Sequence, residues 1–126
     1  MKLEQLINFI PVYEKLKDHT MSLQLAYRLT KIYRVAKEEE DFYRNKLQEI
    51  LKEYAQLDEN GNFIQTDDGA GIKIKPETQP QCIAAINELS MLESTAHFDP
   101  IPLGMFGTEF ELTGAEMDAL MPFIQD

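Results

Sequence analysis

The sequence predicts a mainly helical protein with a small β component. Residues 22–54 contain no glycine or proline, and their apolar residues recur at helical spacing. Shorter helical patterns precede and follow this stretch, and between residues 62 and 75 the pattern changes to alternation. We therefore expect a long helix in an antiparallel helical hairpin, together with a small β-hairpin and two shorter C-terminal helices.

The first helix is expected over residues 3–17, where the apolar residues lie roughly on one side: Leu3, Leu6, Ile7, Ile10, Tyr13 and Leu16. Proline inside a helix removes a hydrogen bond and clashes with the preceding turn. Pro11 therefore leaves two alternatives open. Either the helix kinks there, or it begins near Pro11 and residues 1–10 take another conformation. Thr20 or Ser22 can then cap the next helix.

The long helix carries apolar residues at helical spacing that form a stripe: Leu25, Leu29, Ile32, Ala36, Tyr43, Leu47, Ile50 and Tyr54. At about 1.5 Å per residue it would span roughly 50 Å, whereas a compact domain of this length is only about 35 Å across. We therefore expect a partner, a second copy of the chain or a projecting hairpin. The polar residues 37–41 divide the stripe into two packing zones, residues 25–36 and 42–54.

The β-hairpin is expected directly after the long helix. Residues 58–61, Asp-Glu-Asn-Gly, favour a helix end because asparagine and glycine tolerate the left-handed backbone conformation. Residues 62–66 and 72–75 then form the two strands, and the turn 67–71 connects them.

Two shorter helices are expected in the last third of the chain. One covers about residues 80–95, and the other opens at the capping box of Thr113 and Glu116, after an irregular stretch over residues 98–112. We expect one domain over residues 1–126, with three parts: a helical hairpin (1–57), a β-hairpin (58–76) and an acidic helical part (77–126).

The net charge of −10 is distributed unevenly. Residues 1–60 carry ten Lys or Arg and eleven Asp or Glu, whereas residues 61–126 carry two Lys and eleven Asp or Glu. The resulting net charges are −1 and −9. Such a field repels a phosphate backbone, so we expect no direct nucleic-acid binding, and it favours a basic protein partner. The alternative is that the charge serves solubility alone.

The sequence contains no complete catalytic, metal-binding or cofactor-binding motif. Residues 58–69 resemble the opening of a calcium loop, but Phe63 and Gly69 stand where glycine and glutamate are required. The lone cysteine, Cys82, excludes an internal disulfide and lies on an apolar stripe, so we expect a core residue in a reducing setting. We expect no catalytic residue, metal or cofactor. No membrane helix or secretory signal is expected either.

The candidate functional residues are therefore residues that could contact a partner. One set is acidic and consists of Asp67, Asp68, Glu109 and Glu111. The other set is apolar, lies in the second zone of the long helix and consists of Phe42, Leu47, Ile50 and Tyr54.

Six short motifs follow one another along the chain: Leu25-Ala26-Tyr27-Arg28-Leu29-Thr30-Lys31, Lys52-Glu53-Tyr54, Asp58-Glu59-Asn60-Gly61-Asn62, Asn87-Glu88-Leu89, Ile101-Pro102-Leu103 and Leu112-Thr113-Gly114-Ala115-Glu116-Met117. In this order they resemble a family of small uncharacterised proteins of tailed bacteriophages and prophages. The chain departs from the family at Ser22, where proline is frequent, and lacks its early Asn-Gly. The resemblance implies a phage or prophage origin and expression in the cytoplasm of a bacterial host. It implies no activity.

We expect a non-enzymatic phage accessory protein that acts by protein–protein binding to a host or phage protein. Homodimerisation through the long apolar stripe is the simplest way to bury the surplus helix. Two alternatives stay open: an acidic inhibitor of a host defence or nucleic-acid-binding protein, and a virion assembly factor.

Overall fold

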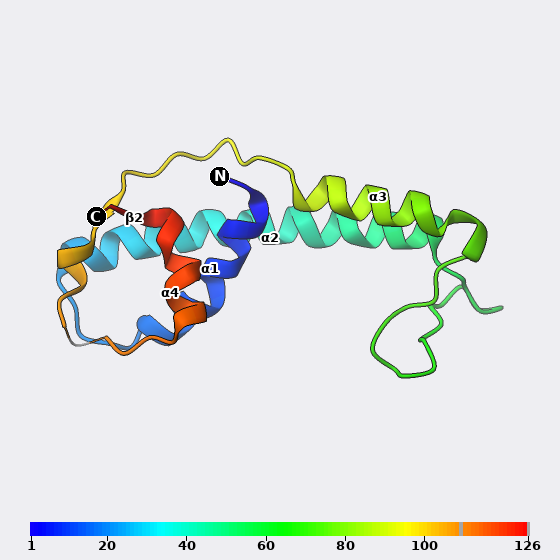
Figure 1. The fold of residues 1–126 in the computed structure, drawn as a ribbon, viewed down its shortest axis with the longest axis horizontal. Helices are drawn as coiled ribbons and strands as arrows, with labels where there is room; N and C mark the ends of the chain where they lie inside the picture. Colours follow the sequence, from blue (N-terminus) through cyan, green and yellow to red (C-terminus); the bar gives the residue numbers. More distant parts are fainter. Residues whose placement is uncertain (109, 126) are drawn as a thin grey trace. The chain divides into compact units, whose positions relative to one another are not determined.

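The computed structural model describes residues 1–108 and 110–125 and is mainly helical (Figure 1). Its α-helices are α1 (Leu3–Leu16), α2 (Leu23–Tyr54), α3 (Gln79–Ser90) and α4 (Gly114–Leu120). The 3-10 helices are η1 (Pro76–Thr78), η2 (Leu103–Phe106) and η3 (Met121–Phe123). Strands β1 (Ile101–Pro102) and β2 (Ile124–Gln125) pair in parallel. The predicted class, mainly helical with a minor β component, is confirmed.

The chain forms two compact units that share the long helix α2. The first unit consists of Met1–Asp41 and Leu92–Asp126, and the second unit is Phe42–Met91. The boundary falls directly after the polar stretch 37–41 of α2. The last part of the chain thus belongs with the first helices rather than forming a unit of its own. The expected single domain with three consecutive parts remains a prediction.

In the first unit, α1 packs against α2 and forms the predicted helical hairpin. The α2 residues of this zone, Leu25, Leu29, Ile32 and Ala36, are all 2% exposed or less. They share one core with the inward-facing residues of α1: Leu6, Phe9, Ile10, Val12 and Leu16. The Oγ of Ser22 accepts the N–H of Leu25 at 3.2 Å, so Ser22 helps to cap α2.

An aromatic series joins α2, α1 and the C-terminal segment of this unit. Tyr33 of α2 stacks on Tyr13 of α1, with ring centroids 4.2 Å apart. Phe9, one turn before Tyr13, lies 5.1 Å from Phe123 of η3, which meets the edge of Phe98 at 6.0 Å. Aromatic pairs contribute about 0.5–1.5 kcal/mol beyond area burial. Three distant chain segments are therefore held in one core.

Helix α1 runs unbroken through Pro11. This excludes the alternative in which residues 1–10 take another conformation. Pro11 is exposed, so its ring does not disturb the core, and the helix loses only the hydrogen bond that a proline cannot donate.

Helix α4 packs against α1, and one carboxylate fixes this arrangement. The N–H of Glu116 donates to Thr113 Oγ1 at 3.1 Å, and the N–H of Thr113 donates to Glu116 Oε1 at 2.8 Å. The predicted capping box is thus confirmed. Lys15 Nζ of α1 donates to the same oxygen at 2.8 Å. The bond from Lys15 above all, and then those from Thr113, lower the pKa of Glu116 to about 2.

In the second unit, the predicted β-hairpin forms as isolated bridges rather than as regular strands. Gln65 pairs with Ile72 in antiparallel fashion, and Ile74 pairs with Ala55, directly after α2 ends at Tyr54. The segment after the turn therefore divides its hydrogen bonds between two neighbours. These pairings are isolated bridges rather than a ladder. Strands β1 and β2 of the described residues lie in the first unit instead.

Helix α3 ends at Ser90, several residues before the predicted end near residue 95. The N–H of Met91 still bonds to helical carbonyls, but the carbonyl of Leu92 accepts the N–H of Leu3 at 2.9 Å. The predicted stripe therefore loses Leu92, which is 43% exposed. A long-range backbone bond, invisible to local periodicity, takes this residue out of the helix.

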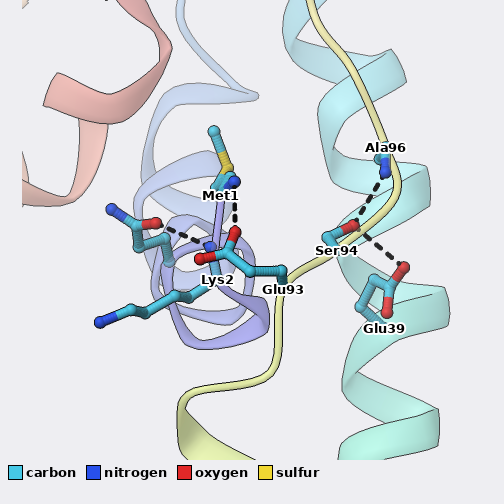
Figure 2. Close-up of polar contacts among 7 residues, drawn as sticks. Met1, Lys2, Glu39, Glu93, Ser94 and Ala96 are labelled. Carbon is cyan, nitrogen blue, oxygen red and sulfur yellow. Dashed lines mark hydrogen bonds and ion pairs between the residues drawn. The ribbon is translucent and has the colours of Figure 1, made fainter.

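The chain after α3 is anchored to the start of α1 and to α2 (Figure 2). The amino group of Met1 donates to Glu93 Oε2 at 2.8 Å, and the N–H of Ser94 donates to the carbonyl of Met1 at 2.8 Å. Ser94 Oγ donates to Glu39 Oε1 at 3.3 Å and accepts the N–H of Ala96 at 3.1 Å. These bonds fix the path by which the chain enters the C-terminal part of the first unit.

The core of the first unit predicts different effects for two leucines of α2. Leu29→Ala should lower the free energy of unfolding by about 2–5 kcal/mol, because Leu29 is 1% exposed and its removal leaves a cavity. Leu23→Ala is the matched control, since Leu23 is 88% exposed, and should change stability by less than about 0.5 kcal/mol. Urea unfolding followed by circular dichroism measures both. Equal losses would contradict the described core.

The low pKa of Glu116 predicts a defined acid sensitivity. Its folded pKa, about 2, lies below the value of about 4.3 for an unfolded glutamate. Ionised Glu116 therefore contributes stability above about pH 4.3, and this contribution is lost as the pH falls through about 2. Glu116→Gln should remove this part of the pH dependence of thermal unfolding.

An NMR titration of the Glu116 carboxyl carbon tests the cause directly. Lys15→Gln should raise the pKa of Glu116 towards its ordinary range, because Lys15 donates the most influential hydrogen bond. An ordinary pKa in the unmodified protein would contradict the described contacts.

Candidate functional site

The candidate site is the continuation of the α2 stripe into the second unit. Tyr43, Leu47, Ile50 and Tyr54 each follow a buried residue of the first zone by 18 residues, about five turns at about 3.6 residues per turn. The two sets therefore lie on the same line along the helix. The first set is buried, whereas the second set is only half-buried. The same stripe is thus covered in one unit and partly open in the other.

Few hydrophobic residues of the second unit are fully buried among those that the structure describes. They are Ala55, Cys82 and Leu89. The covered side of helix α3 combines two small side chains, Cys82 and Ala85, with two larger ones, Ile86 and Leu89. Burial raises the pKa of the Cys82 thiol, which disfavours the reactive thiolate. Cys82 is a core residue, as predicted.

The four predicted apolar residues lie on one helix but not all on one line. Leu47, Ile50 and Tyr54 belong to the stripe, whereas Phe42 lies to its side and is 42% exposed. Lys46 Nζ lies 5.9 Å from the centroid of the Phe42 ring. We refer to these four residues, Phe42, Leu47, Ile50 and Tyr54, as the apolar face.

The structure does not bring the acidic candidates together within one unit. Asp67 and Asp68 lie at an exposed turn of the second unit, whereas Glu111 is exposed in the first unit. Glu109 lies outside the described residues. The Asp68 carboxylate accepts hydrogen bonds from Thr66 Oγ1 and from the N–H of Ala70, and both lower its pKa. These carboxylates therefore have a local structural use in the turn.

Asp67 has a local partner as well. Lys73 Nζ lies 3.9 Å from its Oδ1, in a pair that is open to solvent on both sides. Exposed ion pairs of this kind contribute little to stability. The pair nevertheless reduces the uncompensated negative charge at the turn.

A groove in the first unit was not predicted from the sequence. It encloses about 570 Å³, and its lining includes Tyr27, Arg28 and Lys31 of α2 together with residues 96–99. Sequence reasoning missed it because its two sides lie some sixty residues apart in the chain. One signal was present: residues 20–37 contain no Asp or Glu in a strongly acidic protein.

Metal and membrane sites find no support in the described part of the chain. No group of three or more His, Cys, Asp or Glu side chains there is placed to hold a metal ion. Asp58, which opens the calcium-loop-like sequence, accepts the N–H groups of Asn60 and Asn62 through Oδ1, both at 2.9 Å. Among the same residues, no helix has the length and apolar character that crossing a membrane requires.

No protein-family model matches the chain, and the searches of curated proteins and of solved structures returned no match. The resemblance to phage and prophage proteins therefore remains an expectation based on the sequence motifs.

The hydrogen bond from Thr66 to Asp68 predicts that the pKa of Asp68 depends on the Thr66 hydroxyl. Thr66→Val removes the hydroxyl that contributes most to lowering the pKa of Asp68, so this pKa should rise towards its ordinary range. Thr66→Ser, which keeps a hydroxyl, is the matched control and should retain the low value. An NMR titration of the Asp68 carboxyl carbon measures both, and an unchanged pKa in Thr66→Val would exclude this hydrogen bond.

Proposed function

We propose that this protein acts by binding another protein through the apolar face of its second unit, without catalysis. The observation that supports the proposal is the change in burial along one stripe of α2. The zone with Leu25, Leu29, Ile32 and Ala36 is buried within the chain, and the equivalent positions five turns later are left half-buried. Apolar surface that a chain leaves open in this way favours association.

A second copy of the chain is the simplest partner. Two stripes related by a two-fold axis would cover one another, and self-complementary interfaces of this kind are the commonest in oligomers. The second unit spans only residues 42–91, and units of about 50 residues bury a smaller fraction of their surface than larger domains do, so they are only marginally stable alone. Dimerisation would therefore both complete its core and use its apolar face.

The family resemblance adds the origin of the protein and its place in the cell to the proposal. The protein is then a phage or prophage accessory protein in the cytoplasm of a bacterial host, and its binding partner is a copy of itself or a host or phage protein. The acidic-inhibitor alternative has less support, because the Asp67 and Asp68 carboxylates contact groups of their own turn and Glu111 belongs to the other unit.

Sedimentation velocity at concentrations on the order of tens of micromolar tests the homodimer. The unmodified protein should sediment as a dimer. Leu47→Glu combined with Ile50→Glu should give a monomer, because burying carboxylates in an apolar interface is strongly unfavourable. Phe42→Glu should weaken the dimer without threatening the fold, since Phe42 is 42% exposed.

Leu23→Glu is the matched control, because Leu23 is an exposed apolar residue of the same helix in the first unit. This variant should stay dimeric. A monomeric unmodified protein would exclude the homodimer and leave binding to a different protein. In that case, a bacterial protein should be retained by the unmodified chain and by Leu23→Glu but not by Phe42→Glu. Failure of both experiments would overturn the proposed function.

A further inference from the structure

The first half of α2 carries a group of three positively charged side chains, Arg28, Lys31 and Arg34. Residues 20–37 contain no acidic residue, although the whole chain contains 22. In the described part of the chain, no carboxylate pairs with Arg28, Lys31 or Arg34, whereas Lys37, at the end of the same stretch, pairs with Glu40. A local cationic strip therefore persists within an acidic protein.

This strip borders the groove of the first unit. Lys31 Nζ lies 5.6 Å above the ring of Tyr27, which is 62% exposed. Ile32, Val35 and Phe98 supply apolar lining to the same groove. Cations next to an apolar hollow suit a ligand that combines negative charge with an apolar group.

Arg28 has N–H donors that remain available to bind such a ligand. Its Nη1 donates to the carbonyl of Pro100 at 3.2 Å, which holds the guanidinium beside the segment before β1. A guanidinium has five N–H donors, so others stay available for a carboxylate. Asp99 is the acidic residue of the lining, and it comes from the segment after α3 rather than from α2.

The other side of the groove has the properties of an unpaired strand. Exposed and half-buried residues alternate from Thr95 to Asp99, with Ala96 and Phe98 on the covered side, as in an extended strand that has one face on a core. Among the residues that the structure describes, the last anchored N–H of this segment is that of Ala96 (Figure 2). The backbone N–H and C=O groups of residues 97–99 make no hydrogen bond within that part of the chain.

We propose that this groove binds an extended acidic segment of a partner protein, which adds as a strand beside residues 95–99. Main-chain hydrogen bonds to an exposed edge supply affinity in this mode, and alternate side chains supply specificity. Acidic side chains would face Arg28 and Lys31, and apolar side chains of the same strand would enter the groove. A small anion would leave the backbone groups of residues 97–99 unused, so a polypeptide fits the site better.

This surface is separate from the apolar face, because all of its residues lie in the first unit. The two proposals therefore fail independently. Disruption of the dimer by Phe42→Glu should leave peptide binding at the groove unchanged.

Fluorescence anisotropy with a short, fluorescein-labelled peptide of alternating glutamate and leucine tests the site. The full chain should bind this peptide, with an affinity that falls as salt is added, and should not bind the matching lysine–leucine peptide. Lys31→Glu should weaken binding about tenfold, because it replaces an attraction by a repulsion. Lys52→Glu reverses the charge of another exposed lysine, on the second half of α2, and should not weaken binding.

A peptide whose backbone nitrogens are methylated at alternate positions tests how much the main-chain hydrogen bonds contribute to binding, separately from charge. It keeps every charge but loses the N–H donors, and it should bind at least about tenfold more weakly. Equal binding of the methylated peptide, or equal effects of Lys31→Glu and Lys52→Glu, would overturn the proposal. If the acidic peptide instead dissociates a self-associated form of the chain, the occupant is a second copy and the proposed partner is wrong.

Discussion

The burial of a single apolar stripe on α2 is the constraint on which the rest of the structure depends. In the first unit, α1 and the C-terminal segment together cover the zone between Leu25 and Ala36, and the aromatic contacts of Tyr13 and Phe123 link the covering elements. The same stripe continues into the second unit, where its residues are only half-buried. The proposed association follows from this difference rather than from any catalytic feature.

The polar stretch 37–41 separates the two halves of the stripe and also serves the first unit. Lys37 pairs with Glu40 at 3.0 Å on the helix itself, and Glu39 accepts a hydrogen bond from Ser94 of the returning chain. The bond from Ser94 to Glu39 anchors the segment that leads to the groove. The cationic strip lies just before this stretch on the same helix, so α2 offers a basic surface in one unit and an apolar surface in the other.

Much of the fold could be predicted because its signals are local. The period of the apolar residues determines α1 and α2, and the Thr113–Glu116 capping box determines the start of α4. The end of α3 could not be predicted in this way, because a backbone bond between Leu92 and Leu3 decides it. The pairing of β1 with β2 is likewise a long-range contact. Each strand has only two residues, which is too short for an alternation of apolar and polar residues to predict it.

The candidate site also has some features that the sequence determines and others that depend on the tertiary structure. The sequence by itself determined that Leu47, Ile50 and Tyr54 share a helix face, since helical geometry fixes this once the helix is accepted. Only the tertiary structure decided that this face stays half-open, because burial depends on which segments return to cover it. The groove between Lys31 and Phe98 also required the fold, since its two sides meet only through long-range packing, which local periodicity does not encode.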